Sequence, residues 1–140
     1  MRRRLLSGLA LLLPMSIPAL GASVFTTRLD DPGAVFVTPE SFGVKGDGTS
    51  DDSRALQAAL DQAAAAGNGG VVFLPSGRYR LTRTLYVWRG VRVIGFGATR
   101  PVFVLADDTP GYQKGIGLMV MFTNAGRVAP KPITLTPRQT

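Results

Sequence analysis

The sequence predicts a mainly β fold, in which one α-helix precedes short strands that stack as the first coils of a β-helix. After residue 70, short apolar segments alternate with Gly, Pro, Asp or Ser, as expected for strands joined by turns. Two segments, centred on Phe73 and Val93, lie about 20 residues apart, which is the spacing of stacked coils. No helical pattern returns between the strands, which argues against βαβ units and a doubly wound sheet.

The predicted helix covers residues 51–66 and follows a turn at Gly46-Asp47-Gly48. Glycine permits positive φ there, and Asp47 can accept hydrogen bonds from its own backbone. Ser50, Asp51 and Asp52 supply an N-cap and negative charge for the first turn of the helix.

A narrow apolar stripe with i, i+3, i+4, i+7 spacing runs along this helix. It consists of Leu56, Ala59, Leu60 and Ala63. The other face, with Gln57, Asp61 and Gln62, is expected to be solvated. Gly67 and Asn68 are expected to end the helix in a left-handed conformation.

The expected strands are short and are bounded by turn residues. They cover residues 34–37, 71–74, 79–81, 84–87, 91–94, 102–105 and 118–122. Pro39 is expected to end the first of them. Residues 106–117, rich in Asp, Pro and Gly, are predicted to form a loop.

Residues 1–23 have the parts of a secretory signal peptide. Arg2-Arg3-Arg4 forms a positive start, residues 5–13 form an apolar core, and Ala19-Leu20-Gly21 offers small residues for cleavage. The apolar core is shorter than the roughly 20 residues of a membrane span, so no stable membrane insertion is expected. The alternative is an uncleaved amphipathic anchor. We expect an exported chain, secreted or periplasmic, with cleavage near residues 21–23.

The composition excludes several kinds of site. The 140 residues include no Cys and no His, which removes disulfides, thiolate metal sites and the commonest general base. No cofactor and no metal are expected. The net charge of +7 includes Arg2-Arg3-Arg4, and the remaining Arg residues are scattered. No nucleic-acid partner is expected, and the charge fits an attraction to acidic glycans or a membrane surface equally well.

Several motifs occur in a fixed order between residues 35 and 105. Phe42-Gly43-Val44, Gly46-Asp47-Gly48-Thr49 and Asp51-Asp52 precede an Ala-rich helix, and residues 69–75 and Gly77-Arg78-Tyr79 follow it. This order resembles the N-terminal region of the pectate lyase superfamily, in its rhamnogalacturonase and epimerase-like branch. Such proteins are right-handed parallel β-helices, many of them acting on acidic or neutral polysaccharides, and phage tailspikes are among them.

The resemblance implies both a fold for this chain and its position at the N-terminal end of that fold. It implies a single-stranded right-handed parallel β-helix, with the helix over residues 51–66 capping its N-terminal end. It also implies that the catalytic carboxylates lie on later coils, outside this chain. The same fold supports several chemistries, so it does not by itself define the reaction.

Two motifs imitate ligand-binding loops and depart from them at required positions. Gly95 and Gly97 imitate a dinucleotide loop, but Arg100 stands where its third glycine belongs. Asp47, Thr49 and Asp51 have the spacing of a calcium loop, but Asp52 and Ala58 replace its essential Gly and Glu. Tight corners between coils, turn bonding and helix capping explain these residues without a ligand.

Carboxylates and aromatic rings offer the remaining candidates. Asp107-Asp108 is an adjacent acidic pair in a loop, where two carboxylates rarely converge as glycoside hydrolysis requires. Tyr79, Tyr86 and Trp88 suit either stacking on sugar rings or packing between coils. No residue is therefore assigned a catalytic, cofactor-binding or metal-binding role.

The sequence is interpreted in three parts. Residues 1–23 form the signal peptide, 24–123 the N-terminal cap and first coils of a pectate-lyase-like β-helix, and 124–140 a disordered tail.

Two function classes remain open. One is a polysaccharide-degrading enzyme, a glycoside hydrolase or polysaccharide lyase, whose active site lies outside this chain; the other is a non-catalytic glycan-binding or structural β-helix of the tailspike or adhesin kind.

The expected partner in both classes is a polysaccharide. The residues after Phe122 show no second amphipathic segment that would cover the end of the stack. This open end is therefore expected to self-associate.

Overall fold

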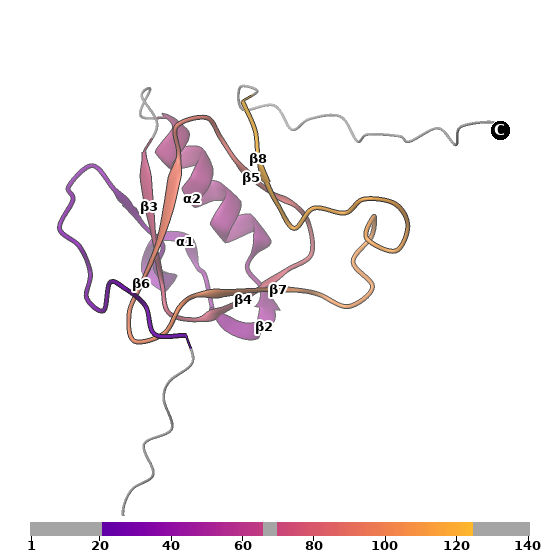
Figure 1. Cartoon of the computed structure of the whole chain (residues 1–140), viewed down its shortest axis with the longest axis horizontal. Coiled ribbons are helices and arrows are strands. Elements are labelled where there is room, and N and C mark those ends of the chain that lie inside the picture. The colour runs from indigo at the N-terminus through magenta and orange to yellow at the C-terminus, as the bar shows by residue number, and fades with distance from the viewer. Residues whose placement is uncertain (1–20, 66–69, 125–140) are drawn as a thin grey trace, which may run out of the picture.

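The computed structural model describes residues 21–65 and 70–124, and the fold of this part is mainly β (Figure 1). Its elements are, in order, β1 (Val35–Phe36), α1 (Pro39–Phe42), β2 (Asp47–Asp51), α2 (Ser53–Ala65), β3 (Val71–Pro75), β4 (Arg78–Leu81), β5 (Leu85–Val87), β6 (Arg92–Phe96), β7 (Val102–Leu105) and β8 (Val120–Phe122). Most of the predicted signal peptide and of the predicted tail, and the expected helix end at Gly67 and Asn68, lie outside the described residues.

The strands form three separate parallel sheets, with the orders β1-β3-β6, β2-β4-β7 and β5-β8. The chain visits the sheets in one order, first as β3, β4 and β5 and then again as β6, β7 and β8. Val72 lies opposite Val93 and Tyr79 opposite Phe103, so each pass stacks on the previous one in register. The expected pairing of the strands around Phe73 and Val93 is confirmed.

Helix α2 lies against the first pass and packs on β1, β3, β4 and β5 (Figure 1). The predicted stripe is the buried face of α2, because Leu56, Ala59, Leu60 and Ala63 are each at most 4% exposed. These side chains join the inward-facing residues of the strands in one core. At about 1.5–3 kcal/mol for each fully buried large apolar side chain, this stripe attaches α2 to the strands.

The opposite face of α2 differs from the expectation. Only Gln62 of the three polar residues expected in water is exposed, whereas Gln57 and Asp61 are half-buried against β5. The amide of Gln57 bonds both backbone groups of Tyr86, and Asp61 accepts a hydrogen bond from Trp88. The prediction of a solvated face at Gln57 and Asp61 was therefore wrong, because Gln57 bonds the backbone at the edge of β5 that does not face β8, and Asp61 bonds the Trp88 side chain.

The segment before α2 contains two elements that the sequence did not reveal. Pro39 begins α1 instead of only ending β1, with Thr38 as the N-cap and Gly43 at φ 72° after the last turn. The predicted turn at residues 46–48 merges into β2, which pairs with β4. Gly46 and Gly48 do have positive φ, 61° and 78°, as the turn required. Helix α2 begins at Ser53 and not at residue 51.

The later strands match their expected positions closely. Strand β7 has the predicted bounds, and the starts of β3, β4, β5 and β6 lie within one residue of prediction. Strand β8 begins at Val120, two residues later than expected. The predicted loop over residues 106–117 contains no strand or helix.

Candidate functional site

The two adjacent carboxylates of the 106–117 loop do not form a catalytic pair. Asp107 and Asp108 are both exposed, and Asp108 has φ 53° in a turn. The loop is held by other groups: Thr109 Oγ1 donates to Ala106 O at 2.6 Å, and Gln113 Nε2 donates to Thr109 O at 2.6 Å. This arrangement supports the interpretation of residues 107–108 as an ordinary exposed turn.

The two aspartates with calcium-loop spacing, Asp47 and Asp51, use their carboxylates to bond nearby protein donors. Asp47 Oδ1 accepts hydrogen bonds from the Thr49 and Ser50 N–H groups, both at 2.8 Å. These bonds, that of Ser50 first, hold the pKa of Asp47 far below its usual value. No group of three or more potential metal-ligating side chains occurs within residues 21–65 and 70–124.

Asp51 connects the start of α2 to the end of β4. Partial burial raises its pKa, but hydrogen bonds from Ser53 and Thr82 outweigh that effect, so the pKa is lowered overall. Ser53 Oγ donates to Asp51 Oδ1 at 2.6 Å, and Thr82 Oγ1 donates to Asp51 Oδ2 at 2.7 Å. The carboxylate therefore caps α2 and has a structural role.

The three aromatic candidates pack within the protein. Tyr79 is 2% exposed, its hydroxyl donates to Pro75 O at 2.8 Å, and burial together with the charge of Asp52 raises its pKa to about 12. Tyr86 and Trp88 stack on each other with ring centroids 5.8 Å apart. Trp88 Nε1 also donates to Asp61 Oδ1 at 2.6 Å. These contacts favour packing within the protein over stacking on a sugar ring.

The glycines of the imitated dinucleotide loop lie where successive passes pack closely. A Cβ at Gly95 would lie 2.6 Å from Pro101 Cδ, and Gly97 has φ 113°. Ser76 Oγ of the preceding pass accepts a hydrogen bond from the Thr99 N–H at 3.0 Å. The glycines therefore permit a corner between β6 and β7, as the structural interpretation required.

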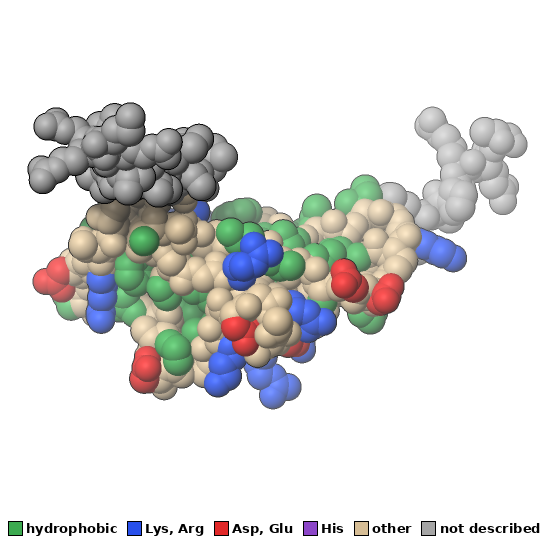
Figure 2. All heavy atoms as spheres, turned by 90° about the horizontal axis from the view of Figure 1, so that it is seen from below, with side chains coloured by type: hydrophobic (Ala, Val, Ile, Leu, Met, Phe, Trp, Pro, Cys, Tyr) green, Lys and Arg blue, Asp and Glu red, His purple; other side chains and the backbone are tan. Residues whose placement is uncertain are grey.

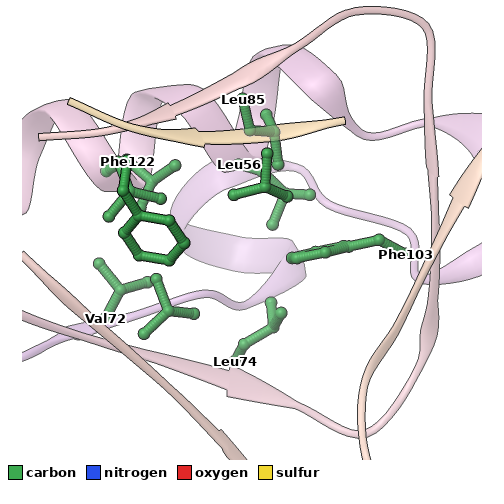
Figure 3. A pocket seen from close by; sticks show the side chains of 10 residues that line it. Leu56, Val72, Leu74, Leu85, Phe103 and Phe122 are labelled. Carbon is green, nitrogen blue, oxygen red and sulfur yellow. The ribbon is translucent and has the colours of Figure 1, made fainter. Parts of the chain in front are cut away.

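An apolar cavity of about 80 Å³ lies between α2 and the three sheets (Figure 3). Its lining is entirely apolar and consists of Leu56, Leu60, Val72, Leu74, Leu85, Val87, Val93, Phe103, Val120 and Phe122. Figure 3 shows Leu56 and Leu85 on one side of it and Val72 and Leu74 on the other. Because no lining residue offers a side-chain polar group, this cavity is part of the core and cannot orient a sugar.

A second hollow, of about 310 Å³, combines charge and apolar surface. It is lined by Val87, Trp88, Arg89, Gly90, Val91, Phe122, Thr123 and Asn124. Arg89 is exposed and Phe122 is 75% exposed. A guanidinium and an aromatic ring in the lining of one hollow suit an anionic, ring-shaped ligand. The sequence analysis selected Trp88 but not Arg89 or Phe122, because Arg89 and Phe122 are far apart in the chain.

The surface seen in Figure 2 carries positive and negative side chains interspersed with apolar ones. In the second sheet Asp47 lies opposite Arg78 and Asp51 opposite Arg80. Such pairing balances charge across the sheet and does not produce the uniformly basic surface of a nucleic-acid-binding protein. Among the described residues, no helix is long and apolar enough to cross a membrane.

These observations define a class of β proteins in which successive passes stack through parallel sheets behind a helix. The sequence model of the family described as rhamnogalacturonase A/epimerase, pectate lyase-like, matches residues 36–129, and the chain belongs to this family. The resemblance found in the motifs of the sequence is thereby confirmed.

Individual relatives share the same region of the chain. Mannuronan C5-epimerase AlgE3 of Azotobacter vinelandii is 40% identical over 106 residues, which cover 68% of this chain and 6% of AlgE3. Alginate lyase 7 of the same organism is 43% identical over 84 residues, 55% of this chain and 10% of the lyase. The solved structure of ORF18 of Geobacillus virus E2 is 36% identical, with a TM-score of 0.38, over 45% of this chain and 13% of that one. The chain thus spans a small part of the length of these relatives.

Proposed function

We propose that this chain is the N-terminal cap and first coils of a right-handed parallel β-helix in an exported polysaccharide-modifying protein. The observation that carries the proposal is the repeated passage through three parallel sheets in a family member. The matched relatives include mannuronan C5-epimerases, an alginate lyase and a glucan 1,3-beta-glucosidase. The glycoside hydrolase or polysaccharide lyase activity expected for the longer protein is part of this proposal.

Helix α2 is proposed as the cap of the β-helix. The third sheet, β5-β8, has two strands where the other sheets have three, and α2 lies beside β5. Because Gln57 of α2 bonds the Tyr86 N–H at 2.9 Å and the Tyr86 carbonyl at 3.2 Å, the helix substitutes for a strand there. A cap of this kind satisfies the backbone at the start of the stack and covers its core.

The proposed partner is an acidic polysaccharide, and the proposed contact is the hollow beside Arg89. An uronate chain offers one carboxylate per residue, which the Arg89 guanidinium can pair with, while the exposed ring of Phe122 offers an apolar surface. The name of the relative alginate lyase 7 supports this class of substrate. The active site is proposed to lie outside this chain, since residues 107–108 do not form one.

The test measures binding and turnover together. We expect the chain to bind alginate in affinity electrophoresis and to release neither reducing ends nor unsaturated products from alginate, pectin, rhamnogalacturonan or β-glucan. Arg89→Gln should weaken alginate binding, whereas Lys114→Gln, an exposed cation in the 106–117 loop, should not. Turnover that Asp107→Asn abolishes would place an active site in this chain. Equal binding to neutral β-glucan would contradict an acidic partner.

The alternative function is a non-catalytic glycan-binding or structural β-helix. The DNA sequence that encodes the protein can distinguish it from the enzyme. Sequencing past the codon for Thr140 tests for further coils. Carboxylates clustered on one face of such coils favour the enzyme, and coils without them favour a tailspike or adhesin kind of protein.

Export is proposed from the sequence of residues 1–23. N-terminal sequencing of the protein recovered from the periplasm or medium should give a first residue near 21–23. Intact Met1 on exported protein would contradict cleavage and favour the uncleaved anchor.

A further inference from the structure

Helix α2 reaches the hollow beside Arg89 through a hydrogen bond to one of its walls. Trp88 lines the hollow, and its Nε1 donates to Asp61 Oδ1 at 2.6 Å. Gln57 Nε2 donates to the same oxygen at 2.9 Å. Asp61 itself is half-buried on α2 and is not part of the lining. The carboxylate therefore lies behind the wall of the hollow, and its Oδ1 joins two side chains.

The indole ring of Trp88 is held on one edge and on one face. An indole has a single N–H donor, so its bond to Asp61 fixes which edge of the ring points toward α2. On the face, Tyr86 stacks with ring centroids 5.8 Å apart and an interplanar angle of 16°. Because Trp88 is only 7% exposed, a ring turned away from Asp61 would leave its N–H buried without a partner, which is unfavourable.

Trp88 also begins the turn that presents Arg89. The Trp88 carbonyl accepts a hydrogen bond from the Val91 N–H at 3.1 Å, which closes a turn over residues 88–91. Gly90 has φ 78° at the third position of this turn, where glycine is favoured. The exposed Arg89 lies between Trp88 and Gly90, so its side chain starts from a backbone whose place depends on Trp88. A displacement of Trp88 therefore changes both the wall of the hollow and the place of Arg89.

The charge of Asp61 is not what favours an anionic ligand. A carboxylate repels another carboxylate, so through its charge Asp61 weakens the binding of a uronate in the hollow. An effect of position has the opposite sign, because losing the bond to Trp88 disturbs the wall and the turn. A substitution that removes the charge, with or without the oxygen acceptor, separates the two effects.

We propose that Asp61 is a positioning residue for the hollow, where it holds the Trp88 ring and, through the turn, the Arg89 guanidinium in place for an anionic ligand. This inference rests on the proposed function of the hollow as the contact with an acidic polysaccharide. Asp61→Leu removes both the charge and the acceptor. Asp61→Asn removes only the charge, because both donors bond the same oxygen, Oδ1, and one amide oxygen can replace it.

The first measurement follows Trp88 without any ligand. Trp88 is the only tryptophan of the 140 residues, so the fluorescence of the full chain, excited beyond the absorption of tyrosine, reports on it alone. We expect Asp61→Leu to shift the emission to longer wavelength and to increase its quenching by acrylamide, because the ring loses the bond that holds it. Asp61→Asn should restore the emission of the unaltered chain. Emission and quenching that stay unchanged in Asp61→Leu would overturn the proposal.

The second measurement is alginate binding in affinity electrophoresis. We expect Asp61→Leu to bind about tenfold more weakly than the unaltered chain, and Asp61→Asn to bind at least as tightly as it. Gln62→Leu is the matched control and should not weaken binding, because Gln62 is exposed on the same helix. Equal or tighter binding by Asp61→Leu would show that Asp61 acts through its charge, and would overturn the positioning role.

Two further results keep the test decisive. Slow exchange of the Leu60 amide in Asp61→Leu shows that weaker binding is not caused by unfolding. If that variant does not fold, Asp61→Ala, which also lacks the acceptor, replaces it in both measurements. An unaltered chain that binds no alginate would contradict the proposed function, and the fluorescence of Trp88 then decides by itself whether Asp61 holds the ring.

Discussion

The first and last passes of the chain are covered very differently. At the first pass, α2 buries Leu56 and Leu60 to 4% exposure and bonds the backbone of the following strands. At the last pass, Val93, Val102 and Phe122 are 38%, 42% and 75% exposed. Within the described residues, α2 therefore packs on one side of the sheets, and the apolar side chains of the last pass remain exposed.

The side on which α2 packs shows how a helix can take the place of a strand. Three α2 residues spaced four apart, Ser53, Gln57 and Asp61, face β4 and β5. Ser53 Oγ accepts a hydrogen bond from the Thr82 N–H at 2.9 Å, and Gln57 bonds both backbone groups of Tyr86. A primary amide has the donor and acceptor of a peptide group, so Gln57 reproduces the contact that a neighbouring strand would make.

The largest difference in the free energy of unfolding is expected between variants that place a charge beside α2 and at the last pass. Leu60→Asp removes a buried leucine and puts a carboxylate in the core, so it should lower the free energy of unfolding by about 3 kcal/mol or more. Val93→Asp, at the last pass, should cost about 1 kcal/mol, because water reaches that position. Chemical denaturation of both variants measures the difference. Equal losses would show that the two positions do not differ in burial.

The next effect tests the strand-like role of Gln57. Gln57→Ala leaves the Tyr86 N–H and carbonyl without their partner, which should cost about 1–3 kcal/mol. Thermal unfolding with exchange at the Tyr86 amide provides the measurement. Gln62→Ala is the matched control on the same helix, since Gln62 is exposed and should tolerate the change. A Tyr86 amide that stays protected in Gln57→Ala would contradict the role.

A smaller effect is expected from acid at the junction before α2. The pKa values of Asp47 and Asp51 lie below the usual 3.8 in the folded protein, so their stabilisation is present above that pH and is lost as the pH falls below it. The melting temperature should stay level between about pH 7 and pH 5 and fall below about pH 4. Asp51→Asn should reduce this fall and Asp107→Asn should not. If the melting temperature falls equally in the unaltered chain, Asp51→Asn and Asp107→Asn, groups other than Asp51 cause the loss of stability in acid.

The sequence predicted the strands after residue 70 well, because each has an apolar run between turn residues. It missed β2, since Asp47-Gly48-Thr49-Ser50-Asp51 has the composition of a turn and becomes a strand through pairing with β4. It also misplaced Gln57 and Asp61, because helical periodicity separates apolar from polar residues but cannot show that a polar face meets a strand. The hollow at Arg89 and Phe122 required the register of β5 and β8, which no local pattern encodes.

The smallest effect is expected at an exposed turn of the 106–117 loop. Asp108 has φ 53°, a conformation that Asn adopts about as readily as Asp, and its side chain is exposed. Asp108→Asn should therefore change the free energy of unfolding by less than about 0.5 kcal/mol. It should also leave alginate binding unchanged, because the residue is not part of the lining of the hollow at Arg89. Denaturant unfolding and affinity electrophoresis of this variant check both expectations. A large loss of binding would show that the loop, and not the end of the third sheet, contacts the glycan.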